Sequence, residues 1–118
     1  MQELHRPKTI IKAIERVGQV HSISDVIKTE HYKCLKIVVD IYEGSLEAKP
    51  YKLEFYCYDK EVISDASKLS EGDYVAIRYR TRSKVNKRTG MFYTNNVCYK
   101  INTITENQLL IFNSKSDE

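Results

Sequence analysis

The sequence predicts an all-β domain in which five strands form a small barrel, with one short helix between the third and fourth strands. Apolar and polar residues alternate over 34–42, 51–58 and 74–83, as they do in strands with one buried face. Residues 59–69 instead carry apolar residues at helical spacing. The chain has 118 residues, of which 42% are hydrophobic and 30% charged, and this suits a single soluble domain with one core.

The first strand is the least clear element. Residues 9–23 contain apolar residues that fit a short helix, but Val17 and Val20 flank Gly18 in a pattern typical of a strand bent at glycine. We favour a strand over 13–23, because Gly18 suits a bulge or a sharp bend. Residues 1–8 are polar and are expected to form a flexible N-terminal arm.

The second and third strands define an inner and an outer face of the barrel. After a connecting loop over 24–33, the segment 34–42 places four aliphatic side chains on its inner face: Leu35, Ile37, Val39 and Ile41. Its outer face carries Lys36, Val38, Asp40 and Tyr42. After a turn region at 44–50, residues 51–58 direct Leu53 and Phe55 inward, so Tyr56 and Tyr58 are expected on the outer surface.

The second half of the chain begins with the helix. Asp59 is a suitable N-cap, and the apolar residues that follow at helical spacing are Val62, Ile63, Ala66 and Leu69. A turn at 71–73 leads into strand four over 74–83, whose inner face carries Val75, Ile77 and Tyr79. A basic hairpin loop, 84–91, has Gly90 at a turn position.

The fifth strand spans 92–104. Asn95 and Asn96 interrupt its alternation, which indicates a bulge and leaves open whether Phe92 or Tyr93 faces outward. Residues 105–118 are expected to form a C-terminal tail, which includes an apolar patch at 109–112 that is a candidate interface for self-association.

The predicted order of elements is three strands, a helix and two strands. This is the element order of the OB fold, a five-stranded barrel. The domain would then span 9–104. An SH3-like or other small β-barrel is the alternative, although such barrels usually lack a helix of this length at this point.

Two motifs lie in the part of the chain after Leu53. The first enters strand four and comprises Leu69, Glu71, Gly72, Asp73 and Val75. The second opens strand five and comprises Gly90, Phe92, Tyr93, Thr94 and Asn95. In these motifs the chain resembles small single-stranded-DNA-binding OB-fold proteins of bacteria and bacteriophages. The resemblance covers roughly 15–104 and implies binding of single-stranded DNA. The chain lacks the tryptophan and the long linker with an acidic and apolar tip that are typical of the bacterial proteins, so it does not imply recruitment of partner enzymes through a tail.

The charge distribution points to the same function. Residues 74–104 contain seven basic residues, five aromatic residues and no acidic one, whereas the rest of the chain has 12 basic and 16 acidic residues. Phosphate attraction and base stacking dominate the binding of single-stranded nucleic acid without sequence preference. The predicted binding residues are Lys36, Tyr42, Tyr56, Tyr58, Arg78, Arg80, Arg82, Lys84, Lys87, Arg88, Phe92 and Tyr93.

Each of these features also has a purely structural interpretation. The arginine row Arg78, Arg80 and Arg82 could protect an edge strand against aggregation, and the basic hairpin could simply be solvated. One of the two strand-three tyrosines could pack under a loop or in a dimer contact. Tyr32, in the first loop, fits a residue that caps the barrel end better than one that covers a base.

The sequence gives little support to other functions. The spacing of the three cysteines, Cys34, Cys57 and Cys98, is not that of metal ligands, and we interpret them as reduced thiols in or near the core. The three histidines are scattered and form no pattern with other candidate ligands. No catalytic motif is present, and the acidic residues Asp40, Glu43 and Glu54 match no nuclease pattern. We therefore expect no enzyme activity, metal or cofactor. There is also no apolar run of membrane-spanning length and no secretion signal.

The sequence therefore predicts a cytoplasmic or nucleoid-associated protein that binds single-stranded DNA in replication, recombination or repair. Because one OB domain covers only a few nucleotides, we expect a homo-oligomer, with replication or recombination proteins as possible partners. Two alternatives remain open: an OB subunit that mediates protein interactions in a replication complex, and an RNA-binding OB protein, since stacking and phosphate contacts serve both nucleic acids.

Overall fold

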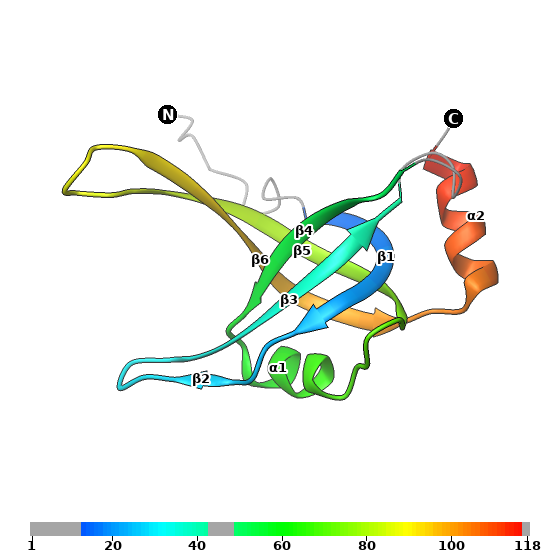
Figure 1. Cartoon of the computed structure of the whole chain (residues 1–118), viewed down its shortest axis with the longest axis horizontal. Coiled ribbons are helices and arrows are strands. Elements are labelled where there is room, and N and C mark those ends of the chain that lie inside the picture. The colour runs from blue at the N-terminus through cyan, green and yellow to red at the C-terminus, as the bar shows by residue number, and fades with distance from the viewer. Residues whose placement is uncertain (1–12, 43–48, 117–118) are drawn as a thin grey trace, which may run out of the picture.

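A computed structural model describes residues 13–42 and 49–116, so the expected arm and most of the turn region 44–50 lie outside the described residues. The barrel strands are β1 (Ile14–Ile23), β3 (Lys33–Ile41), β4 (Tyr51–Cys57), β5 (Tyr74–Val85) and β6 (Phe92–Thr103). The remaining elements are the short strand β2 (Ile27–Lys28) and the helices α1 (Lys60–Ser67) and α2 (Glu106–Ser116). The predicted closed five-stranded barrel is confirmed, with one extra strand and one extra helix (Figure 1).

β1 closes the barrel because it pairs with both β5 and β3. Gly18 lies at the corner and is in register with Val75 on one side and Ile41 on the other. A Cβ atom at this position would overlap the backbone carbonyl oxygen of Asp40, so only glycine allows the two strands to approach this closely. Residues 14–23 thus form the strand that we favoured over a helix, although the register shift against β3 occurs between Val20 and Ser22 rather than at Gly18.

The core is formed by the inner faces that the alternation predicts. Leu35, Ile37 and Phe55 are at most 1% exposed, and the Phe55 and Tyr79 rings meet edge to face with centroids 4.8 Å apart. The α1 residues Val62, Ile63 and Ala66 complete the cluster. The faces of β3, β4 and β5 are therefore oriented as predicted, and their outer faces are available for a ligand.

α1 follows β4, the third barrel strand, and both its start and its exit are explained by the sequence. The Asp59 carboxylate accepts a hydrogen bond from the Glu61 backbone N–H at 2.8 Å, as expected of an N-cap. After the helix, Gly72 adopts a φ of 94° in the turn into β5. That turn is held against β1 by backbone hydrogen bonds from Gly72 N to Val20 O and from Val20 N to Asp73 O, both 2.8 Å. This part of the motif at 69–75 therefore has a structural role.

Two segments contain secondary structure that the sequence interpretation missed. The expected loop 24–33 contains β2, which pairs with the start of β3 and extends that hairpin. The expected tail contains α2, which begins with a reciprocal capping box: Gln108 N donates to Thr105 Oγ1 at 3.1 Å and Thr105 N donates to Gln108 Oε1 at 2.8 Å. α2 contacts β1 and β5, and its Leu109 is fully buried, so part of the apolar patch serves the fold of this chain itself.

The β5–β6 hairpin also differs in detail from the prediction. β5 continues to Val85, so the loop is shorter than the predicted 84–91. The bulge predicted at Asn95 and Asn96 is wrong, because both residues pair regularly with β5 and the register shift leaves Tyr99 unpaired instead. The Asn96 amide instead donates a hydrogen bond to the Glu54 carbonyl oxygen at 3.2 Å, which links β6 to β4.

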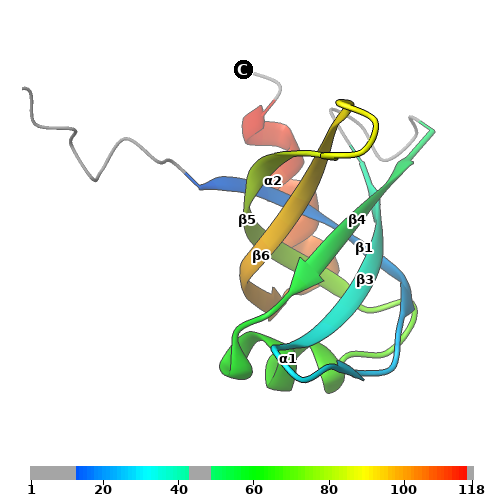
Figure 2. The same ribbon diagram turned by 90° about the vertical axis from the view of Figure 1, so that its left-hand side faces the viewer.

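The β2–β3 and β5–β6 hairpins project beyond the barrel toward the same side, at the left of Figure 1. Seen from that side, β6, β4 and β3 cross the surface between the two hairpins (Figure 2). Together with the adjacent β5, these strands form the outer face that carries predicted binding residues of β3, β4 and β5.

Candidate nucleic-acid interface

A row of outward residues crosses four adjacent strands. Lys36 on β3 is in register with Tyr56 on β4, Tyr56 with Val97 on β6, and Val97 with Arg80 on β5. Since in-register neighbours lie on one face of a sheet, these four side chains form a continuous surface that spans three strand spacings, or roughly 15 Å. The fold therefore brings predicted residues from β3, β4 and β5 onto one face.

Three tyrosines form a cluster on this face. The Tyr56 and Tyr58 rings are nearly parallel, with an interplanar angle of 16° and centroids 6.4 Å apart. Tyr32, in the turn at the tip of the β2–β3 hairpin, meets Tyr58 edge to face with centroids 5.8 Å apart. Tyr58 is 39% exposed and Tyr32 53% exposed, so each presents ring surface to solvent. Exposed ring faces of this kind can stack on unpaired bases.

Burial raises the pKa of Tyr58, and the neighbouring Cys34 thiol, to which its hydroxyl is hydrogen-bonded, adds to the effect. Tyr58 is therefore neutral at neutral pH. A neutral ring carries no charge that would repel phosphate.

The three arginines of the predicted row have different partners. Arg78 Nε donates to Glu15 Oε2 on β1 at 3.1 Å, which neutralises its charge within the barrel wall. The Arg80 guanidinium lies over the Tyr99 ring, 5.3 Å from the centroid, in a cation–π contact. In the described part of the chain the side chains of Arg82 and Lys84 make no hydrogen bond or ion pair, so their charges are available to a ligand.

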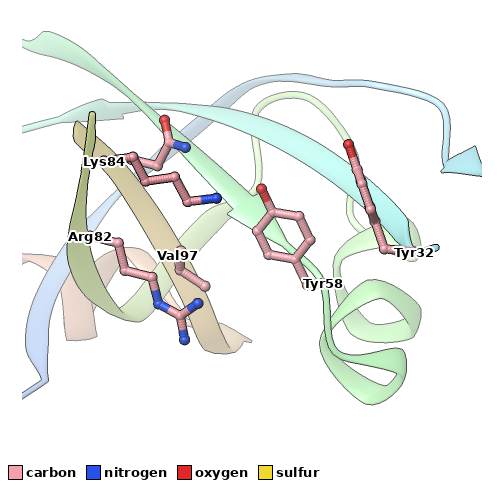
Figure 3. A pocket seen from close by; sticks show the side chains of 6 residues that line it. Tyr32, Tyr58, Arg82, Lys84 and Val97 are labelled. Carbon is pink, nitrogen blue, oxygen red and sulfur yellow. The ribbon is translucent and has the colours of Figure 1, made fainter. Parts of the chain in front are cut away.

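Arg82 and Lys84 form one wall of a pocket next to the tyrosine cluster. The pocket has a volume of about 280 Å³ and is lined by Tyr32, Tyr58, Arg82, Lys84, Asn95 and Val97. Figure 3 shows Arg82, Lys84 and Val97 on one side and Tyr58 and Tyr32 on the other. An aromatic wall that faces a cationic wall is suited to a base on the ring and a phosphate on the cations.

The register of the β5–β6 hairpin decides between Phe92 and Tyr93. Tyr93 is in register with Lys84 and therefore lies on the face that carries Arg82 and the pocket. Phe92 is in register with Val85 on the opposite face, where it is 76% exposed. Of the two candidates, Tyr93 is therefore the one that shares a face with the pocket.

The hairpin tip holds two further predicted cations in a well-defined turn. The Asn86 side chain accepts hydrogen bonds from the backbone N–H groups of Arg88 at 2.9 Å and Thr89 at 3.3 Å. Gly90 has a φ of 72°, which confirms its predicted turn position. Lys87 and Arg88 are exposed at this tip, beyond the pocket and on the hairpin that carries its cationic wall.

Two predicted residues on β3 are less well placed. Lys36 belongs to the outer row, but its Nζ is 3.2 Å from Glu54 Oε2, and this contact raises the pKa of Lys36 while reducing its attraction for phosphate. Tyr42 lies six residues further along the chain, about 20 Å at the rise of an extended strand. It does not line the pocket.

The sequence interpretation missed Asn95, Val97 and Tyr99 as surface residues of the site and assigned Tyr32 to the barrel end. The alternation of β6 reverses at the Tyr99 bulge, so a face assignment counted from Ile101 is wrong for Val97 and Asn95. The two adjacent asparagines in the middle of this strand were the available signal for a polar site.

The part of the chain that the structure describes contains no group of three or more His, Cys, Asp or Glu residues that could hold a metal ion. Among the same residues, no helix is long and apolar enough to cross a bilayer.

The barrel, with its two projecting hairpins, is similar to several solved structures. A mitochondrial single-stranded DNA-binding protein of S. cerevisiae superposes with a TM-score of 0.64 at 12% identity, over 80% of this chain and 97% of that one. This chain has the OB fold. The small single-stranded DNA-binding protein of Streptomyces coelicolor gives an OB-barrel match with a TM-score of 0.58 at 13% identity, covering 81% of this chain and 96% of that one.

A third OB-barrel match is the Plasmodium falciparum SSB in complex with single-stranded DNA. Its TM-score is 0.60 at 14% identity, and the match covers 89% of this chain and all of that one. No protein-family model and no curated protein sequence matches the chain. Its structural neighbours are thus small single-stranded-DNA-binding OB-fold proteins, and they share the fold with it at low sequence identity.

Proposed function

We propose that this protein binds single-stranded DNA, with little dependence on sequence, across the face formed by β3, β4, β6 and β5. The observation that carries the proposal is the pocket between the tyrosine cluster and the cations Arg82 and Lys84, which have no partner among the described residues. The structural neighbours, all single-stranded DNA-binding proteins by description, support it.

The mechanism is passive. Unpaired bases stack on Tyr58, Tyr56 and Tyr32, each stacked base contributing roughly 1–3 kcal/mol. Phosphates are bound by Arg82, Lys84 and the cations of the hairpin tip, with release of counterions. The strand that is bound in this way is withheld from base pairing. The process served is replication, recombination or repair, in which single strands are exposed.

The geometry of the site favours single strands over duplex. The tyrosine cluster offers aromatic rings on which unpaired bases can stack. The described part of the chain has no basic helix that could enter a major groove, since α1 carries two acidic residues, Glu61 and Asp65, against one lysine, Lys60. A merely basic surface would instead prefer the higher charge density of duplex DNA.

Self-association is part of the proposal, because one OB domain covers only about 4–16 nucleotides. On α2, Leu110 and Ile111 are 43% and 56% exposed, although Leu109 beside them is buried against the barrel. Light scattering coupled to size exclusion tests this point. A monomer at micromolar concentration would contradict self-association and leave the proposed binding site unaffected.

Fluorescence anisotropy with labelled dT, rU and duplex oligonucleotides of equal length, at two salt concentrations, tests the function. We expect tight dT binding that weakens with salt and much weaker duplex binding. Preference for rU over dT would reassign the site to RNA. Duplex binding equal to or tighter than dT binding would overturn the single-strand assignment.

A further inference from the structure

The polar groups that line the pocket do not suit the four bases equally. Arg82 and Lys84 can only donate hydrogen bonds, and the only side chain of the lining that both donates and accepts, apart from the tyrosine hydroxyls, is Asn95. Asn95 is half-buried and lies opposite Arg82 in the β5–β6 ladder. Hydrogen-bond donors therefore outnumber acceptors among the polar groups that line the pocket, and the Asn95 amide oxygen is available to accept a hydrogen bond.

None of these three side chains is occupied by the protein. Within the described residues, Arg82, Lys84 and Asn95 form no side-chain hydrogen bond or ion pair, whereas the neighbouring Arg78 and Asn96 are both bound to other groups. A pocket of about 280 Å³ lies at the lower end of the ~300–1,000 Å³ range of small-molecule sites, so it suits one base rather than two.

The four bases differ in the hydrogen-bonding groups that they would present to this lining. Thymine and uracil present a carbonyl, an N–H and a second carbonyl along their pairing edge, and guanine presents the O6 carbonyl beside an N–H. Cytosine and adenine carry an amino group in place of that carbonyl. An amino group directed at a guanidinium or an ammonium group leaves donors facing donors, without acceptors.

We propose that this pocket binds one nucleobase and selects keto bases (thymine, uracil or guanine) over amino bases (cytosine or adenine). The base lies against Tyr58, and its ring N–H donates to Asn95 Oδ1. Its carbonyl oxygens each accept one hydrogen bond from Arg82 or Lys84, and the remaining N–H groups of these two side chains bind the adjoining phosphates. This inference rests on the proposed single-strand binding and adds a local base preference to an interface that is otherwise tolerant of sequence.

Labelled (dU) and (dC) oligonucleotides of equal length, compared by anisotropy with the full chain at neutral pH and one salt concentration, test the preference. These two pyrimidines differ only in the groups that the pocket would read. We expect the Kd for dC to exceed that for dU by about five- to tenfold, the lower range for a base-edge contact at a half-exposed site.

Asn95→Ala should bring this ratio to within about twofold, because the acceptor for the ring N–H is lost. The matched control is Thr94→Ala on the opposite face of the same strand, which should preserve the ratio. Arg82→Met is a second variant, and it should lower the ratio as well as the affinity for both oligonucleotides.

Equal affinity of the unaltered protein for dU and dC would overturn the base preference and leave single-strand binding intact. If the ratio of the dC Kd to the dU Kd is unchanged in both Asn95→Ala and Arg82→Met, the assignment is also overturned, because the preference would then arise outside this pocket. If neither oligonucleotide binds, the proposed function fails and this inference fails with it.

Discussion

Arg78 Nε donates a hydrogen bond to Glu15 Oε2 at 3.1 Å, so the first arginine of the β5 row is bound to a neighbouring strand rather than free for a ligand. Arg82, four residues on, has no such partner among the described residues and lines the pocket. Arginines that look equivalent in the sequence therefore differ in what they can contribute.

Arg82→Gln should weaken binding of a dT oligonucleotide by about 1 kcal/mol and lower the magnitude of its salt slope by about one, since one phosphate contact is lost. The control is the double variant Glu15→Gln with Arg78→Gln, which removes an ion pair without changing net charge and should bind as the unaltered protein does. Equal losses in both would mean that Arg78 contributes to binding as much as Arg82 does, despite its ion pair with Glu15.

Tyr58→Ala should weaken dT binding by about 1–3 kcal/mol with an unchanged salt slope, because stacking releases no counterions. Tyr58→Phe retains the ring and should bind nearly normally, although it loses the hydrogen bond to Cys34. A large loss in the phenylalanine variant would assign the effect to the hydroxyl instead of to stacking.

Gly18→Ala should lower the free energy of unfolding by at least about 3 kcal/mol, because the added methyl group would overlap the Asp40 carbonyl where β1 closes the barrel. Gly72→Ala is the comparison: its methyl group meets no atom within 4 Å, so only the positive φ opposes it, at about 1–2 kcal/mol. Chemical denaturation measures both, and a smaller loss at Gly18 than at Gly72 would contradict the proposed corner.

The three cysteines should react with iodoacetamide at about pH 8 only after unfolding, because the thiolate is the reactive form and all three side chains are buried. Burial raises the pKa of Cys34, and the hydrogen bond to Cys98 together with burial raises that of Cys57, so thiolates of these two residues are scarce in the native state. The same contact with Cys57 lowers the pKa of Cys98, so Cys98 is protected by its burial, which keeps the reagent away. Mass spectrometry counts the adducts. Rapid native labelling of Cys34 would show that the start of β3 opens readily.

The sequence predicts the barrel and much of its outer face because strand alternation determines which side chains are buried. Phe55 and Tyr79 had to point inward, and this placed Tyr56 and Arg80 outside. The partners of the arginines could not be predicted, because Glu15 and Tyr99 reach them through strand register and a bulge that leave no local signal. α2 had a signal in the Thr105–Gln108 capping box, but the four consecutive apolar residues that follow it, 109–112, have no helical spacing.

The most direct measurement is a backbone NMR titration of the full chain with a short dT oligonucleotide. We expect little change in α1 and the largest chemical-shift changes at the residues that line the pocket: Tyr32, Tyr58, Arg82, Lys84, Asn95 and Val97. Changes concentrated on α1, or the absence of any saturable change at low salt, would contradict the claim that this face binds single-stranded DNA.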